Sequence, residues 1–152
     1  MSEKAVSTAG MITVRPIQFG SDEHALEVEL RTKVLRTPLG LTFSEEELAR
    51  ESSDFHFGAF CPELIGCLIL TPKTRSILKM RQVAVDFASQ GLGAGKLLVA
   101  FSEVFARGEG FTEMELSARM NAVPFYLGLG YVASGEDFME VGIPHRKLTK
   151  RI

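Results

Sequence analysis

The chain has no tryptophan, only two tyrosines and two cysteines, and no long run of apolar residues. A helix that spans a membrane needs about 20 consecutive apolar residues, so the missing run argues against a membrane protein. The charges nearly cancel, and a net charge of -2 gives no electrostatic reason to expect nucleic acid as a partner. The 152 residues suffice for one globular domain with a substantial core.

The two cysteines, Cys61 and Cys67, lack the spacing of a metal site and have no nearby histidine or cysteine in the sequence, so no metal is expected. We expect reduced thiols in a cytoplasmic protein, although a hairpin could bring the two together as a disulfide. The first ten residues, MSEKAVSTAG, lack the apolar core of a secretory signal. We expect residues 1–10 to be a loose, flexible leader and residues 11–152 to form a single domain.

Local signals predict a mixed α/β chain. A helix should begin at Ser21 or Asp22, which can cap it, and end near Thr37, because Pro38 disfavours helical geometry just before it. The SEEE that starts at Ser44 resembles a capping box. The other predicted segments are strands over residues 12–18, 54–60, 64–71, 78–85 and 112–118, a helix over residues 91–107 buried through Leu97, Leu98, Phe101, Val104 and Phe105, a short helix capped by Asn121, and closing strands near residues 131–133 and 146–149 around a loop at 134–144. This order predicts an α/β domain.

Residues 90–96, QGLGAGK, are the most informative segment of the chain. They follow an apolar strand and lead into a long helix, whose first N–H groups lack partners and favour an anion. A P-loop would place Ser or Thr after the lysine, but Leu97 stands there. A dinucleotide fingerprint read from Gly91 would put Lys96 in place of its last glycine. Alternatively, the glycines mark a turn and a helix start and bind no ligand.

A third pattern does fit. Gln90, Gly93 and Gly95 match Q/R-x-x-G-x-G/A directly after the strand that ends in Val83-Ala84-Val85, and residues 121–131, NAVPFYLGLGY, match a second signature. Both resemble the GNAT N-acyltransferase superfamily. The resemblance implies a three-layer αβα fold with a splayed mixed sheet, and acetyl-CoA as the cofactor. It implies cofactor contacts at Val83, Ala84, Val85, Gln90, Gly91, Leu92, Gly93, Ala94, Gly95, Lys96 and Asn121, with an oxyanion-binding backbone N–H near Val85.

The same resemblance implies catalytic roles. Tyr126 would protonate the departing thiolate, unless it is simply an aromatic side chain packed on the core. Of the three histidines, we expect His24 to be solvated and His56 to be a surface or packing residue. His145 follows GIP, and GIPH before a short strand looks like the glyphosate N-acetyltransferase branch, in which a histidine at this position is the general base. Glu140 is a weaker candidate for base or for orienting His145.

That branch also holds a small anionic substrate with arginines, and this chain has Arg36, Arg81 and Arg119 at the matching places. Guanidinium groups bind carboxylates or phosphonates in a bidentate manner. Each arginine also has a plain structural interpretation, as a helix-terminal charge, an outward strand residue and a loop residue. The expected activity is acetyl transfer to a small anionic amine. A protein or peptide acetyltransferase and a non-catalytic CoA-binding domain stay open, and exposed strand edges make a homodimer plausible.

Overall fold

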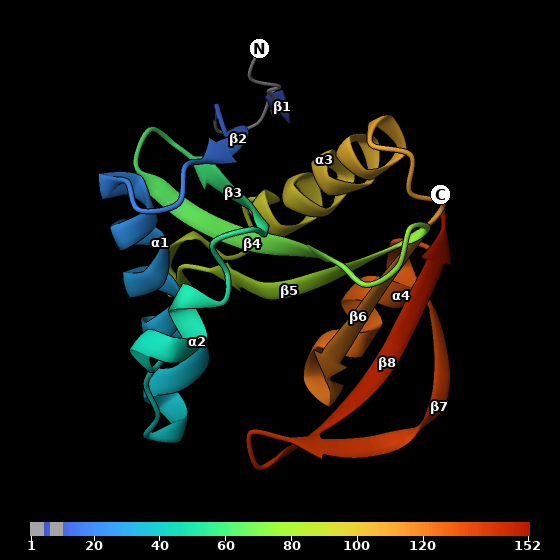
Figure 1. Ribbon diagram of the computed structural model, residues 1–152. Coiled ribbons are helices and arrows are strands. Elements are labelled where there is room, and N and C mark those ends of the chain that lie inside the picture. The colour runs from blue at the N-terminus through green and yellow to red at the C-terminus, as the bar shows by residue number, and fades with distance from the viewer. Residues whose placement is uncertain (1–4, 7–10) are drawn as a thin grey trace. The chain divides into compact units, whose positions relative to one another are not determined.

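The structure is a computed structural model that describes residues 5–6 and 11–152. Of the expected leader, only Ala5–Val6 lie within the described residues, and they form the short strand β1 (Figure 1). The chain divides into two compact units. The boundaries between the units fall within β4, β5 and α3, so each of these elements contributes residues to both units.

The first unit comprises the described part of Met1–Leu70 together with Gln82–Ser102. Its strands follow the order β1-β2-β3-β4-β5, and β1, β2, β3 and β4 pair antiparallel. Its elements are β2 (Thr13–Ile17), α1 (Asp22–Arg31), the π-helical turn η1 (Thr32–Arg36), the 3-10 turn η2 (Thr37–Leu39), α2 (Glu45–Ala49), β3 (Phe55–Phe60), most of β4 (Leu64–Pro72), the end of β5 (Ile77–Val85), the 3-10 turn η3 (Phe87–Ser89) and the start of α3 (Ala94–Gly108).

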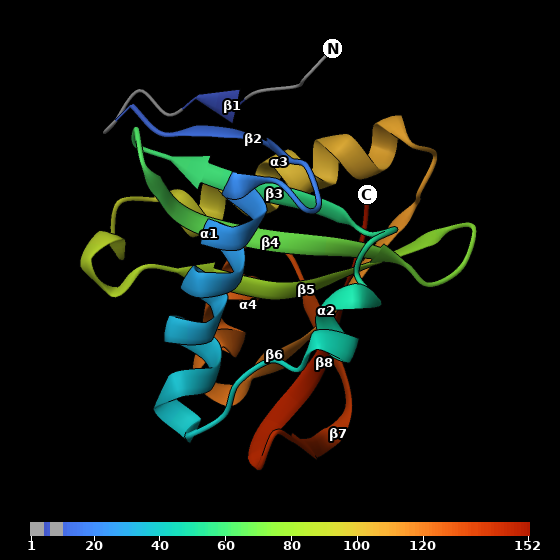
Figure 2. The ribbon, with the colours of Figure 1, turned by 60° about the vertical axis from the view of Figure 1, so that its left-hand side comes forward.

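Helices α1 and α3 cover opposite faces of this part of the sheet. Cys67 of β4 packs in a buried cluster with Leu30 of α1, whereas a Cβ built on the neighbouring Gly66 would lie 3.1 Å from the Cδ1 atom of Leu98 in α3. Successive strand residues point to opposite faces, so the two helices sandwich the strands between them. Figure 2 shows α1 lying across β3 and β4. The first unit therefore has the expected helix–sheet–helix layers.

The predicted starts of α1 and α2 are confirmed. The Ser21 side chain accepts from the His24 N–H (3.1 Å) and caps α1. Ser44 and Glu47 form a reciprocal capping box at the start of α2, with bonds of 3.0 and 3.1 Å. The helical path from α1 continues through η1 and η2 and ends at Gly40, whose φ of 71° terminates it.

The second unit, Thr71–Arg81 with Glu103–Ile152, has the strand order β5-β6-β8-β7. Strand β6 (Glu113–Arg119) pairs parallel with the start of β5 and antiparallel with β8 (Ile143–Arg151), and β8 pairs antiparallel with β7 (Val132–Glu140). The 3-10 turn η4 (Met120–Ala122) and the short helix α4 (Val123–Gly128) join β6 to β7. The sheet of this unit is mixed, as expected.

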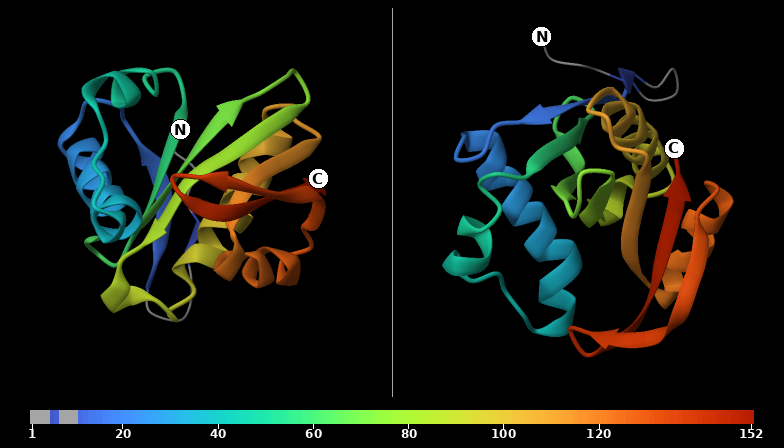
Figure 3. Two further views of the ribbon diagram at one scale, coloured as in Figure 1. Left: turned by 90° about the horizontal axis from the view of Figure 1, so that it is seen from below. Right: turned by 45° about the vertical axis from the view of Figure 1, so that its right-hand side comes forward.

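Three predictions for the β7–β8 segment and for α3 are wrong. The loop expected at residues 134–144 is instead a hairpin of β7 and β8, drawn in orange and red in Figure 3. Its turn uses Val141 and Gly142, both at positive φ. Helix α3 begins at Ala94 and not at residue 91, because Gly91 and Gly93 adopt positive φ. Val104 is 57% exposed and does not belong to the buried stripe of α3.

Within the residues that the structure describes, no helix combines the length and the apolar character needed to cross a membrane.

Candidate active site

The glycine turn before α3 is open on its outer side. Gly91 and Gly93 have φ values of 87° and 89°, and an added Cβ at either position would meet no atom within 4 Å. Residues other than glycine rarely adopt this backbone conformation. The Gln90 side chain donates to the Val85 carbonyl (3.3 Å) and so fastens the turn to the end of β5. The turn can accept a group that lies directly against its backbone.

The start of α3 presents unpaired backbone donors. The Leu97 N–H makes the first bond of the helix, to the Gly93 carbonyl (3.0 Å), so the N–H groups of Ala94, Gly95 and Lys96 precede the hydrogen-bonded ladder. The first turn of this 15-residue helix contains no acidic residue that would neutralise its positive end. Bare amides and the helix dipole together favour an anion at this point.

The three strand residues expected beside the cofactor form the end of β5. Ala84 is 2% exposed and packs on the α1 side with Leu30, whereas Val83 and Val85 are half-buried. The residue before them, Gln82, has a φ of 55°, which is rare for a residue with a side chain inside a strand. Such a kink redirects the following backbone groups, which an oxyanion-binding amide near Val85 would need.

Asn121 does not cap α4. It lies exposed inside the 3-10 turn η4, and Ala122 occupies the N-cap position of α4 without a side-chain cap bond. Pro124 stands in the first turn of α4, where its missing N–H costs nothing, so the preceding residues form a separate turn. The predicted capping role of Asn121 is wrong. The cofactor contact of Asn121 stays a prediction.

Tyr126 is buried on α4. It is 6% exposed, and its ring makes edge contacts with Phe125 (5.0 Å between centroids) and Tyr131 (5.8 Å). Burial raises the pKa of its phenol, so Tyr126 keeps its proton at neutral pH. Among the described residues its hydroxyl has no hydrogen-bond partner. A protonated hydroxyl without a protein acceptor can donate to a ligand.

His145 has one nitrogen fixed and the other available. Its Nδ1 lies 2.9 Å from the Ile143 carbonyl oxygen, which can only accept, so Nδ1 carries a proton. Its Nε2 then has the lone pair and lies 3.7 Å from a carboxylate oxygen of Glu140, whose side chain is 51% exposed. This is the tautomer that a general base needs, and Glu140 is placed to stabilise the imidazolium that would form.

His145 also lies in a row of side chains across three strands. Arg119 of β6 is its directly opposed partner on one side, and Phe138 of β7 is its partner on the other. Directly opposed residues have Cβ atoms about 4.5–5.5 Å apart and point to the same face. The Phe138 ring stacks on the His145 ring at 6.1 Å. The structure thus brings together two of the predicted site residues, His145 and Arg119.

The other two predicted arginines already have contacts. Arg36 donates to the Thr42 carbonyl (2.8 Å) and to Glu47 (3.2 Å), and its guanidinium lies 4.0 Å from the ring centroid of Phe43. A guanidinium has five N–H donors, so these two bonds leave others for a ligand. Arg81 donates to the Thr71 hydroxyl (3.3 Å).

Comparison with known proteins identifies the family. The family model described as "Acetyltransferase (GNAT) domain" matches residues 38–152, which is most of the chain. The chain belongs to the GNAT acetyltransferase family. The expected superfamily and the mixed α/β fold are thereby confirmed.

Individual relatives of this GNAT chain are distant. The protein YyaT of Bacillus subtilis (strain 168) is 35% identical over 74 residues, which are 49% of this chain and 50% of YyaT. The chain thus spans about half the length of the curated relatives it matches. An acyl-CoA N-acyltransferase structure from Pseudomonas aeruginosa is 20% identical with a TM-score of 0.76, covering 96% of this chain and 99% of the other. A GNAT family acetyltransferase from Elizabethkingia anophelis, solved with acetyl-CoA bound, is 19% identical with a TM-score of 0.72, covering 93% and 98%. At these identities, the two structures show a common fold.

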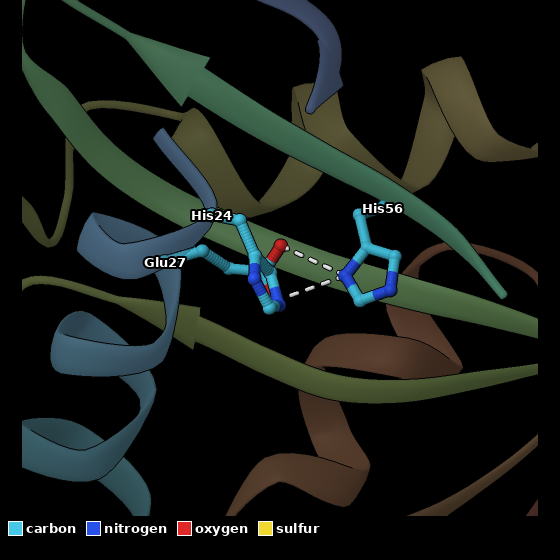
Figure 4. A group of neighbouring side chains, drawn as sticks. All are labelled: His24, Glu27 and His56. Atoms are coloured by element: carbon cyan, nitrogen blue, oxygen red, sulfur yellow. Dashed lines mark hydrogen bonds and ion pairs between the residues drawn. The ribbon is translucent and has the colours of Figure 1, made fainter. Parts of the chain in front are cut away.

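The GNAT chain contains one polar cluster that the sequence did not lead us to expect. His24 is not solvated and His56 is not on the surface: they are 8% and 3% exposed. His56 and Glu27 are hydrogen-bonded (Figure 4), and Arg31 of α1 donates to both Glu27 (3.0 Å) and Glu51 (2.9 and 3.0 Å). We call Glu27, Arg31, Glu51 and His56 the buried ion cluster. The sequence signal for this cluster is the four-residue spacing of Glu27 and Arg31 on one helix.

Proposed function

We propose that this GNAT chain transfers an acetyl group from acetyl-CoA to the primary amine of a small anionic metabolite resembling an amino acid. The observation that carries the proposal is the open glycine turn followed by bare amides at residues 94–96. An anion site built from backbone suits the diphosphate of coenzyme A. The acetyl-CoA bound in the Elizabethkingia relative supports the same ligand.

The turn and the strand before it are the parts proposed to hold acetyl-CoA. When bound, this ligand supplies an activated acetyl group as a thioester. The residues assigned to it are Val83, Ala84, Val85, Gln90, Gly91, Leu92, Gly93, Ala94, Gly95, Lys96 and Asn121. The exposed position of Asn121 leaves its amide accessible for such a contact.

His145 and Tyr126 are the proposed proton carriers. The Nε2 atom of His145 takes a proton from the ammonium group of the acceptor, because only the neutral amine has a lone pair for attack. The nitrogen forms a bond to the acetyl carbon as the carbon–sulfur bond breaks. The phenol of Tyr126 gives its proton to the departing thiolate. The fixed tautomer of His145 and the raised pKa of Tyr126 support these opposite roles.

Arg36, Arg81 and Arg119 are proposed to hold the anionic group of the acceptor. Support is strongest for Arg119, because it lies directly opposite His145 across the β6–β8 ladder. A carboxylate bound there would leave a nearby amine within reach of the proposed base. This arrangement favours the glyphosate N-acetyltransferase-like branch within the family. Cys61 and Cys67 form no disulfide in the described part of the chain, which favours a reducing compartment such as the cytoplasm.

Release of free thiol tests the proposal. Purified protein is given acetyl-CoA with separate panels of amino acids, aminophosphonates and basic peptides. We expect thiol release with anionic small amines and none with peptides. Release with peptides alone would replace the proposal with a protein acetyltransferase. Thermal stabilisation by acetyl-CoA with no release in any panel would indicate a non-catalytic binding domain.

A further inference from the structure

His56 in the buried ion cluster is hydrogen-bonded through both ring nitrogens. Its Nε2 lies 2.8 Å from the Glu51 carbonyl oxygen, and its Nδ1 lies 3.0 and 3.1 Å from the two carboxyl oxygens of Glu27. A neutral imidazole has a single N–H, so it cannot donate to both groups. Both Glu27 oxygens face Nδ1, and one of them also accepts from Arg31, so the geometry favours an ionised Glu27 and a proton on each nitrogen of His56.

The doubly protonated form also balances the charges of the cluster. Glu27 and Glu51 are two anions, and Arg31 and His56 are two cations; all four side chains are almost fully buried. Buried charges are costly unless they are paired and hydrogen-bonded. Loss of the proton from His56 would remove one of these two cations from the cluster.

A metal ion is the rival occupant. His24, Glu27 and His56 offer ligand atoms that all lie within 4.8 Å of one another. The Nδ1 of His24, however, accepts a hydrogen bond from the Gly20 N–H (3.2 Å), so the neutral ring keeps its proton on Nε2. That nitrogen is buried and without a partner, and it has no lone pair to give to a metal. The contacts favour a proton between Glu27 and His56.

The cluster connects His56 to Arg36 through an unbroken series of contacts. Glu51 binds Arg31 with both carboxylate oxygens, and the Arg31 guanidinium lies 4.5 Å from the ring centroid of Phe43. The Arg36 guanidinium lies 4.0 Å from the centroid of the same ring. Two guanidinium groups thus contact one aromatic ring, an arrangement that cation–π attraction stabilises. Arg36 sits at the end of the π-helical turn η1, a feature often found at functional sites.

We infer that His56, as an imidazolium, is a positioning residue that holds Arg31 and Phe43, and through them Arg36, in the arrangement that binds the acceptor. The last step rests on the proposed function, since Arg36 is an acceptor ligand only there. The inference adds a proton-dependent control on acceptor affinity, which the fold and the proposed chemistry do not require.

The groups around His56 define the pH range in which this control acts. Burial lowers the pKa of His56, but the hydrogen bond and charge of Glu27 outweigh it and raise the pKa above the ordinary 6.5. His24, beside it on α1, has a lowered pKa because of burial, and the Cys67 thiol of β4 has a raised pKa and stays neutral. The imidazolium is therefore the main form at pH 6.5 and below, and it is lost as pH rises through the raised pKa.

Nuclear magnetic resonance of the wild-type protein tests the inference without using activity. We expect the His56 ring to titrate above pH 6.5 with both nitrogens protonated below that point, and the Phe43 ring signals to move with the same midpoint. A neutral His56 at pH 6.5 would overturn the inference. So would a Phe43 ring that does not respond while His56 titrates. Binding of added Zn²⁺ at one equivalent, with matching shifts of His24 and His56, would assign the cluster to a metal.

Three variants extend the test. His56→Gln should remove the alkaline midpoint from the Phe43 signals. His24→Gln should leave it in place, because the His24 ring touches the His56 ring edge-on (5.2 Å between centroids) but forms no hydrogen bond with the buried ion cluster. Glu27→Gln removes the negative charge that stabilises the proton on His56, so the midpoint of the His56 titration should move to lower pH. If His56→Gln does not fold, Glu27→Gln and the wild-type titration still decide the question.

Kinetics then separates this inference from the proposed function. With an active acceptor, KM for the acceptor should rise about 10-fold or more across the His56 midpoint while KM for acetyl-CoA stays level, since loss of an ionic hydrogen bond costs about a factor of ten. A flat acceptor KM together with a responding Phe43 ring would overturn the positioning role. Absence of turnover with every acceptor would refute the proposed function but leave the spectroscopic result standing.

Discussion

Two histidines of this chain are equally buried and differ in what their nitrogens face. His145 of β8 and His56 of β3 are each 3% exposed. The Nδ1 of His145 is bonded to a carbonyl oxygen, and its Nε2 points toward a carboxylate 3.7 Å away, beyond hydrogen-bonding distance. Both nitrogens of His56 are bonded to acceptors. The comparison teaches that two equally buried histidines can differ in their hydrogen-bond partners, which leave Nε2 of His145 without a hydrogen bond and both nitrogens of His56 bonded.

The largest effect should come from removing His145, the proposed general base. His145→Ala should lower kcat about 10²–10⁴-fold, which is the usual contribution of a general base. The KM for acetyl-CoA should change little. Steady-state thiol release measures both, with His24→Gln as the control, because His24 is a buried histidine outside the proposed site. An unchanged kcat would remove His145 from the mechanism.

The buried ion cluster around His56 should contribute to the stability of the fold. Arg31→Leu leaves Glu27 and Glu51 without their shared cation, and breaking a buried ion pair in this way costs about 3–5 kcal/mol of unfolding free energy. Urea denaturation at neutral pH measures the loss. A cost of about 1 kcal/mol or less, typical of surface pairs, would mean that the cluster contributes little to stability.

Tyr126 extends the comparison to a group that must give a proton. Tyr126→Phe keeps the ring and its packing but removes the hydroxyl, so kcat should fall about 10²-fold if Tyr126 is the acid. Because burial raises the pKa of this phenol above its ordinary 10.0, wild-type kcat should show no alkaline limb from Tyr126 below that pH. A variant as fast as the wild type would leave Tyr126 with a packing role alone.

The smallest effect should come from an exposed pair. Arg146 and Asp137 are 2.9 Å apart on the β7–β8 hairpin, with side chains 35% and 49% exposed. Such pairs contribute about 0–1 kcal/mol, so Arg146→Ala should barely change the urea midpoint. A loss as large as that of Arg31→Leu would show that exposure does not separate these two ion pairs.

Features with local causes could be predicted from the sequence. The Ser44 capping box and the glycine turn at residues 90–96 each depend on neighbouring residues. The helix end predicted near Thr37 is wrong, because the helical path runs through Pro38 and ends at Gly40. The two family signatures could be recognised because each one is formed by residues close together in the sequence. His145 and Arg119 lie directly opposite each other because of the register between β6 and β8. This register could not be predicted from the sequence.

Features made by distant residues could not be predicted. The bond between Glu27 and His56 joins residues 29 apart in the chain, and His56 gives no sign of it beyond its place in an alternating strand. The extension of β7 over residues 134–140 contains a glycine and three acidic residues, so only its pairing with β8 makes it a strand. Asn121 was assigned a cap because asparagine favours that position, but Pro124 fixes the start of α4 one residue later.

The central claim is that the backbone amides at the start of α3 bind the diphosphate of coenzyme A. Amide chemical shifts measured during titration with coenzyme A, and in parallel with pantetheine, which lacks the diphosphate, test it most directly. The account predicts large shifts at residues 93–96 with coenzyme A and small ones with pantetheine. Binding of coenzyme A that leaves these four amides unmoved, or equal shifts with pantetheine, would contradict it.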